Sequence, residues 1–285
     1  MGIVFTPEQL SARKIPSLQN YGNGLVELKQ ELENLYNQGR LHSATLYGSS
    51  VDNPSDVRVG SDVDIFVILY SMDAQQELQR LRSLADKIYL PIEINPLITV
   101  EQAKQGLHGM QQYFRACLEA SSKSGYLIGN DPFGILAKRL ANLTPLQEFI
   151  TFQEDNLRRL SRESTESYNE RHCQFLSRLF NYPSFIPTEL FFIRHKTIPT
   201  KNGRLLSRKE RILLLKDEFP EIGAEPLEHI SSMYEAYREF LETIVTSTTD
   251  PDVSEYKKLL DEITSLYPEI DKFIRDCLIF SVSTY

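Results

Sequence analysis

The sequence predicts a small mixed α/β domain followed by an all-α helical bundle. Short runs rich in β-branched and aromatic residues alternate with helical periodicity as far as about residue 133. Beyond that residue, apolar side chains recur at helical spacing only. The 285 residues are 41% hydrophobic and 25% charged, which is typical of globular proteins, and the length suits two domains. We therefore expect one domain over residues 1–133 and a second over 134–285.

The first elements follow from local patterns. Residues 1–23 contain prolines and a glycine and are expected to form an irregular lead-in. Leucines at helical spacing then predict a helix over residues 25–35, which Gly39 ends. Residues 44–47 are expected to form a strand, and the polar residues 52–60 a loop.

The strongest predicted strand is 62–70, which is rich in Val, Ile and Phe. Apolar residues at helical spacing predict a helix over 78–88, and residues 90–97 are expected to form another strand. A short strand and turn over 125–132 would close the first domain. This alternation of helices and strands indicates a small mixed sheet.

The second half shows three amphipathic helical patterns. The apolar positions of each pattern share one face. They are Leu146, Phe149, Ile150, Leu157 and Leu160; Ile230, Met233, Tyr234, Tyr237, Leu241 and Ile244; and Tyr256, Leu259, Leu260, Ile263 and, beyond Pro268, Ile270, Phe273, Ile274 and Cys277. These patterns predict that residues 134–285 form a helical bundle.

Several classes of protein are excluded by composition. No apolar run reaches the roughly 20 residues that a membrane span needs, and residues 1–6 do not resemble a signal peptide. Cys117, Cys173 and Cys277 lie far apart and form neither a zinc-binding spacing nor a disulfide framework, which favours a reducing cytoplasm. The 31 basic and 39 acidic residues give a net charge of −8, which favours nucleotides carried with Mg²⁺ over long nucleic acid.

One pattern indicates phosphate and metal chemistry. Gly48-Ser49 ends a predicted strand, and Asp62 and Asp64 follow after a spacer of twelve residues. Carboxylates at positions i and i+2 of a strand lie on one face and repel each other unless they share a cation. Mg²⁺ prefers such oxygens and shares them with substrate phosphates. Gly48 would let the backbone approach a phosphate, and Ser49 would offer it a hydroxyl and an N–H.

A third acid lies in the next predicted strand. Glu93 stands between Ile92 and Ile94, so its side chain faces opposite to theirs. If this strand neighbours the strand of Asp62, three carboxylates converge on one site.

These residues resemble those of the nucleotidyltransferases of the DNA polymerase beta superfamily. The resemblance covers residues 24–97, with the motif in 46–65. It implies that residues 1–133 are a catalytic domain in which Gly48 and Ser49 hold a nucleoside triphosphate (NTP). It also implies that Asp62 and Asp64 bind two Mg²⁺ ions and that Glu93 is a third ligand or a general base. In order and length, the helical half is similar to the bundle of antibiotic nucleotidyltransferases.

A basic stretch lies in the second half. Residues 194–211 contain seven Lys and Arg residues but a single acid, Glu210. Ser207 and Glu210 fit a capping box, which predicts that a helix starts at Arg208. A basic helix N-terminus attracts anions, so Lys201, Arg208 and Lys209 are predicted to contact the phosphates of the NTP. A solvated basic loop is the alternative.

The predicted reaction is transfer of a nucleoside monophosphate from Mg²⁺–NTP to a hydroxyl acceptor, with release of pyrophosphate. Acidity and the helical half favour a small acceptor such as an aminoglycoside-like compound. The alternatives are a toxin/antitoxin-type enzyme that modifies tRNA or protein, a cyclic-oligonucleotide synthase, and a catalytically inactive nucleotide-binding regulatory module. The sequence leaves the acceptor, the base preference and the oligomeric state open.

Overall fold

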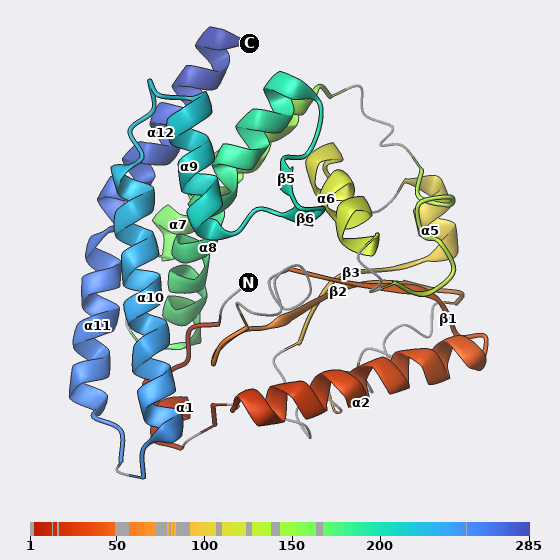
Figure 1. Cartoon of the computed structure of the whole chain (residues 1–285), viewed down its shortest axis with the longest axis horizontal. Coiled ribbons are helices and arrows are strands. Elements are labelled where there is room, and N and C mark those ends of the chain that lie inside the picture. The colour runs from red at the N-terminus through yellow and green to blue at the C-terminus, as the bar shows by residue number, and fades with distance from the viewer. Residues whose placement is uncertain are drawn as a thin grey trace.

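A computed structural model of the chain confirms the predicted fold class (Figure 1). A four-stranded mixed sheet with helices is followed by a helical bundle. The structure describes residues 3–12, 14–15, 17–48, 57–71, 79, 81, 83, 92–106, 110–123, 127–137, 143–163, 168–248 and 250–285.

The sheet has the strand order β3-β2-β1-β4. Its strands are β1 (Leu41–Tyr47), β2 (Val63–Leu69), β3 (Ile92–Thr99) and β4 (Leu127–Gly129). Strand β1 runs antiparallel to β2 and to β4, whereas β2 and β3 are parallel. The predicted strand at 90–97 therefore does neighbour the strand that follows Asp62.

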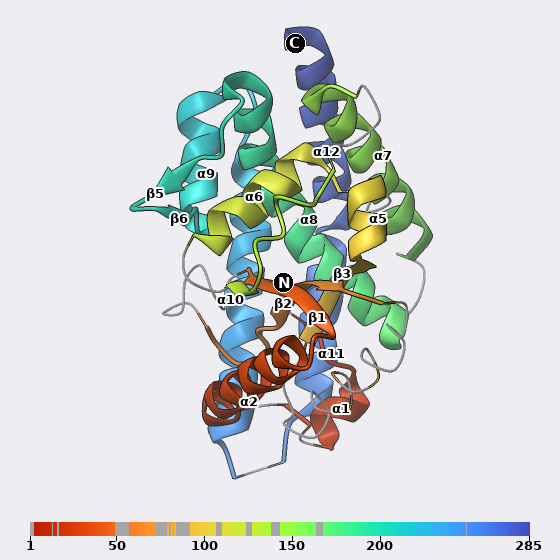
Figure 2. The same cartoon turned by 90° about the vertical axis from the view of Figure 1, so that its right-hand side faces the viewer.

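Helices cover both faces of this sheet (Figures 1 and 2). Helix α2 (Leu18–Asn37) packs on one face, where its leucines meet alternate residues of β1 and β2. Helices α5 (Val100–Gln105) and α6 (Gln112–Ser122) cover the other face, where Phe66 and Ile68 of β2 are buried. Because side chains alternate along a strand, neither face of β2 is left to water.

The expected irregular lead-in over residues 1–23 is wrong for its described part. Helix α1 (Pro7–Ser11) begins there, with Pro7 in its first turn and a capping box between Thr6 and Gln9. Helix α2 begins at Leu18, before the predicted position. The start of α1 was missed because its capping box uses Gln9 rather than a glutamate. The start of α2 was missed because the packed helix tolerates Gly22 and Gly24.

Other elements differ from their predictions mainly in their limits. Strand β1 begins three residues before the predicted 44–47, and β3 ends two residues after the predicted 90–97. The predicted helix at 78–88 lies mostly outside the described residues, as do residues 52–56 of the predicted loop. Helices α5 and α6 were not expected from the sequence.

The helical half confirms its predicted character. It consists of α7 (Pro145–Glu163), α8 (Glu170–His195), α9 (Arg208–Glu218), α10 (Glu225–Thr246), α11 (Val253–Ser265) and α12 (Tyr267–Thr284). Helix α9 starts at Arg208 with the predicted capping box. A hairpin of β5 (Thr200–Lys201) and β6 (Arg204–Leu205) precedes it. No helix among the described residues is both long enough and apolar enough to cross a membrane.

The N-terminal segment packs with the helical half. Val4, Phe5 and Leu10 belong to the same buried cluster as the helices α7 to α12. The N–H of Phe5 donates to Tyr237 Oη at 3.1 Å, and Tyr256 Oη donates to the carbonyl of Phe5 at 2.6 Å. The predicted domain boundary between residues 133 and 134 stays a prediction. Residues 4–10 precede this boundary in sequence but pack against helices that follow it.

Candidate functional site

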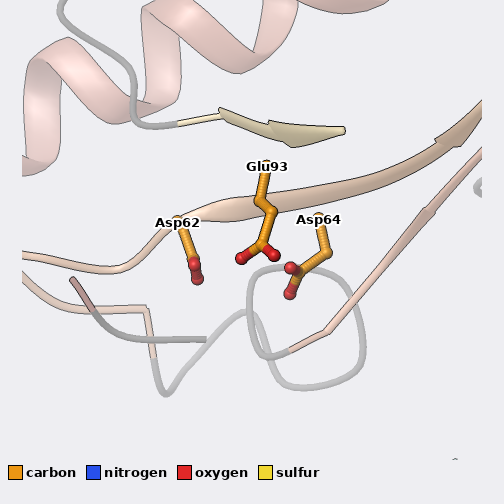
Figure 3. Close-up of side chains that lie close together, drawn as sticks. All are labelled: Asp62, Asp64 and Glu93. Carbon is orange, nitrogen blue, oxygen red and sulfur yellow. The ribbon is translucent and has the colours of Figure 1, made fainter. Parts of the chain in front are cut away.

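Three carboxylates converge at one end of the sheet (Figure 3). Asp64 on β2 pairs in register with Glu93 on the parallel strand β3, and Asp62 lies directly before β2. Each residue offers one oxygen, and these oxygens all lie within 4.8 Å of one another. The i, i+2 spacing predicts that Asp62 and Asp64 share one face of the sheet. In the structure this is the face opposite α2, since Val63 and Ile65 pack with the leucines of α2.

The triad of Asp62, Asp64 and Glu93 is largely withdrawn from solvent. Asp62 is 3% exposed and Asp64 is 2% exposed, whereas Glu93 is half-buried. Burial raises the pKa of Asp62 above its ordinary value, and the neighbouring charges of Asp64 and Glu93 raise it further. Glu93 is thus the member of the triad with the greatest access to solvent.

Tyr47 is a residue of this site that the sequence analysis missed. It ends β1 opposite Asp64, and its ring packs edge-on against Phe114 of α6 at 5.4 Å between centroids. Burial raises the pKa of Tyr47, and the charges of Asp64 and Glu93 add to the shift. Its position next to Gly48 is the one signal in the sequence that could have indicated it.

Gly48 lies against the triad. Its φ is +86°, a conformation that side chains rarely adopt, and a Cβ at this position would collide with Asp64 Oδ2. The absence of a side chain is therefore what allows the end of β1 to approach the carboxylate of Asp64. Ser49, the predicted phosphate contact beside it, lies outside the described residues.

The donor set of the triad fits a hard divalent cation. Opposite ligands of one Mg²⁺ ion are roughly 4 Å apart, given a metal–oxygen distance near 2.1 Å, and no two of the triad oxygens are more than 4.8 Å apart. Three buried or half-buried carboxylates at this separation repel one another unless a cation shares them. Asp62, Asp64 and Glu93 are therefore the residues that could hold Mg²⁺.

The predicted phosphate contact Lys201 has an acidic partner in the helical half. Its Nζ lies 3.0 Å from Glu210 Oε1. Arg204 also pairs with Glu210, through Nη1 at 2.7 Å, and holds the pKa of that carboxyl well below its usual range. Two cations of the basic stretch therefore share one carboxylate at the start of α9.

Arg208 is also engaged within the helical half. It donates from Nη1 to the carbonyl of Phe180 at 2.6 Å and from Nη2 to Asn181 Oδ1 at 3.3 Å. Its guanidinium lies 4.1 Å from the ring centroid of Tyr234. Lys209 has an exposed side chain. Phosphate binding by Lys201, Arg208 and Lys209 stays a prediction, and it requires the first two to exchange these partners.

Comparison with known proteins finds similarity to solved structures but none at the level of sequence. No protein-family model matches this sequence, and no curated protein matches it. The structure is similar to a crystal structure of spectinomycin adenyltransferase AAD(9) from Enterococcus faecialis with ATP and spectinomycin, at 12% identity and a TM-score of 0.35. The match covers 89% of this chain and 100% of that chain. A similarity at this TM-score supports no conclusion about activity.

Proposed function

We propose that this protein is a Mg²⁺-dependent nucleotidyltransferase that moves a nucleoside monophosphate from an NTP to a hydroxyl acceptor. The observation that carries the proposal is the convergence of Asp62, Asp64 and Glu93 beside Gly48. A carboxylate cluster alone indicates a cation site. A glycine at a strand end beside that cluster also lets a phosphate approach the backbone closely.

Asp62 and Asp64 would hold two Mg²⁺ ions, with Glu93 as a third ligand or as the general base. The ions would lower the pKa of the acceptor hydroxyl and offset the charge of the triphosphate. The buried aspartates suit permanent ligands because little solvent competes for their oxygens. Gly48 and Ser49 would contact the triphosphate through backbone and hydroxyl groups.

Glu93 is suited to accept the proton of the acceptor. It is less buried than Asp62 and Asp64, so an incoming hydroxyl can reach it. In the proposed step, the acceptor oxygen forms a bond to the α-phosphorus and the bond from that phosphorus to the bridging oxygen breaks. The acceptor proton passes to Glu93, and pyrophosphate leaves with the electron pair. The protein contributes mainly by positioning these groups.

The proposed acceptor is a small molecule such as an aminoglycoside-like compound. The net charge of −8 favours a cationic acceptor over a polyanion. Moreover, Lys201 and Arg204 share the carboxylate of Glu210, which offsets part of the positive charge that the basic stretch could offer to tRNA.

The test uses α-³²P-labelled NTPs and Mg²⁺, with aminoglycosides or a cell extract as acceptors. Labelled product is expected from the wild type, and Asp62→Asn or Asp64→Asn should reduce its rate by at least about 1000-fold because a ligand charge is lost. Asp155→Asn, which removes one partner of an exposed ion pair with Arg159, is the matched control and should retain the wild-type rate.

Two results would contradict the proposal. Equal labelling by the Asp62→Asn variant and the wild type would show that the triad is not the reacting site. Stabilisation by Mg²⁺–NTP without release of pyrophosphate, with every acceptor, would favour the regulatory module. Label in the RNA or protein fraction of the extract would support nucleotidyl transfer but would show that the acceptor is a macromolecule and not a small molecule.

A further inference from the structure

The turn that precedes Asp62 is held by the helical half. Residues 58–61 form this turn, in which the N–H of Ser61 donates to the carbonyl of Arg58 at 3.0 Å. The N–H of Arg58 donates in return to Ser61 Oγ at 3.2 Å. Gly60 has a φ of +82°, and a Cβ there would lie 2.9 Å from Leu241 Cδ1 of α10. The turn therefore fits closely against α10.

Arg238 of α10 makes the central contact with this turn. It is 4% exposed, and its Nη2 donates to Ser61 Oγ at 3.0 Å. Its Nη1 donates to Tyr234 Oη at 2.6 Å, and its buried Nε has no hydrogen-bond partner among the described residues. Within that part of the chain, Arg238 forms no ion pair with a carboxylate, so its polar contacts are directed at Tyr234 and at the turn.

Two acids of α10, one helical turn before and one after Arg238, also contact the turn at residues 58–61. The guanidinium of Arg58 lies 3.1 Å from Glu235 and 3.9 Å from Glu242. Glu235, Arg238 and Glu242 recur at spacings of three and four residues and therefore share one face of α10. This face meets the turn from Arg58 to Ser61.

Asp62 differs from the other two acids in how its backbone is held. Asp64 and Glu93 lie in paired strands, so the register of β2 and β3 sets their positions. Asp62 precedes the first registered residue of β2, and its carbonyl accepts a hydrogen bond from Tyr21 Oη at 3.0 Å. On its N-terminal side, the neighbouring residue Ser61 is held by Arg238.

We propose that Arg238 is a positioning residue for the carboxylate triad and acts through Ser61. By fixing the turn against α10, it sets the backbone of Asp62 and hence the distance of its carboxylate from Asp64 and Glu93. The proposal rests on the proposed function, since it assumes that the triad binds a divalent cation. It also makes the helical half part of the metal site, although none of the three ligands comes from that half.

The experiment measures binding of Mn²⁺, a hard cation that prefers oxygen ligands, to the full chain by titration calorimetry without nucleotide. Ser61→Ala and Arg238→Met should each weaken Mn²⁺ binding about tenfold, as is typical when the support of a ligand is lost. The double variant should bind about as weakly as either single variant because both changes break the same hydrogen bond, that from Arg238 to Ser61. Ser61→Ala also removes the acceptor of the Arg58 N–H, and Arg238→Met also removes the donor to Tyr234. Ser61→Thr keeps the hydroxyl and should restore binding.

Tyr234→Phe is the matched control. It removes the other hydrogen bond of the same guanidinium and leaves the bond to Ser61 in place. Its Mn²⁺ affinity should equal that of the wild type. Equal weakening by Tyr234→Phe and Ser61→Ala would indicate a general loss of packing and would overturn the positioning role.

Asp62→Asn separates this proposal from the proposed function. Loss of Mn²⁺ binding in Asp62→Asn, with wild-type affinity in Ser61→Ala, would overturn the role of Arg238 alone. Wild-type affinity in both variants would mean that the triad is not the cation site, and both proposals would then fail. Ser61→Ala removes only a hydroxyl, so the test does not depend on Arg238→Met folding.

Discussion

Gly48 shows how much of the site depends on one residue. It combines a positive φ with a close approach to Asp64, and either requirement alone would favour glycine. Gly39 has a similar φ of +69° but has nothing within 4 Å of an added Cβ. A substitution at Gly39 therefore causes backbone strain alone, whereas one at Gly48 causes backbone strain and also displaces the Asp64 carboxylate.

We expect Gly39→Ala to lower the free energy of unfolding by about 1 kcal/mol and to leave nucleotidyl transfer unchanged. Gly48→Ala should incur the same strain and also reduce transfer by about 100-fold, because a displacement of about 1 Å at a reacting site costs that much. Urea unfolding and initial rates measure the two effects. Equal rates for both variants would contradict the close packing of Gly48 against the triad.

Asp62, Asp64 and Glu93 could be predicted from local spacing because strand geometry alone decides which side chains share a face. Whether Glu93 meets the two aspartates depended on strand order, which the sequence did not determine. Only its position next to Gly48 could have indicated Tyr47, and nothing in the sequence indicates Arg238. Arg238 contacts Ser61 across 177 positions of sequence, and no periodicity reports such a contact.

At the scale of single elements, the start of α9 was predicted correctly. Ser207 Oγ accepts from the N–H of Glu210 at 3.4 Å, and Glu210 Oε2 accepts from the N–H of Ser207 at 2.8 Å. This capping box is readable from sequence because its partners are three residues apart. What the sequence did not show is that Lys201 and Arg204 also bind Glu210.

Ser207→Ala should lower the free energy of unfolding by about 1 kcal/mol, because the N–H of Glu210 loses its acceptor. Ser207→Thr should lose less, since it keeps a hydroxyl at the cap position. Urea unfolding of the two variants and the wild type gives the comparison. If Ala and Thr are equally destabilising at this position, the cap is not the source of the stability.

A second element-scale feature is Glu189 on α8, which lies beside α6 and α7. It lines a small pocket together with Tyr113 and Glu148, and Gln153 Nε2 donates to its Oε2 at 2.6 Å. Burial raises the pKa of Glu189 to about 8, against the opposing effect of the Gln153 amide. Because the folded pKa exceeds the unfolded one, the stability that Glu189 contributes is complete below about pH 4.5 and is lost as pH rises towards 8.

Glu189→Gln should therefore flatten the loss of stability between pH 5 and pH 8, since a glutamine does not ionise. The variant is expected to be more stable than the wild type at pH 8 and of similar stability at pH 5. Urea unfolding at several pH values measures this difference. Glu154→Gln, at an exposed ion pair on α7, is the control and should follow the wild type. If the free energy of unfolding depends on pH in the same way for Glu189→Gln and wild type, ionisation of Glu189 is not the cause of the loss of stability.

At the scale of the whole molecule, the N-terminal segment joins the two halves. The N–H of Ile3 donates to the carbonyl of Gly60 at 3.0 Å, directly beside the turn that leads to Asp62. The N–H of Val4 donates to Ser177 Oγ on α8 at 3.1 Å. The same few residues thus contact the helical core and the approach to the triad.

Leu10→Ala should lower the free energy of unfolding by about 3 kcal/mol, because Leu10 is fully buried in the cluster of the helical half. Leu213→Ala on α9 should change it by less than about 0.5 kcal/mol, since Leu213 is 57% exposed. Chemical denaturation of both variants provides the measurement. A small effect of Leu10→Ala would contradict the packing of the N-terminal segment against the helices.

The sequence by itself determined the order of a mixed α/β half and a helical half, the capping box at Ser207, and the facing of Asp62 and Asp64. All of these depend on residues a few positions apart, whose geometry helices and strands fix locally. The tertiary structure alone decided that β3 lies beside β2, that residues 3–10 pack among the helices, and that Arg238 reaches Ser61. These contacts join distant segments, and only the packing of a shared core selects them.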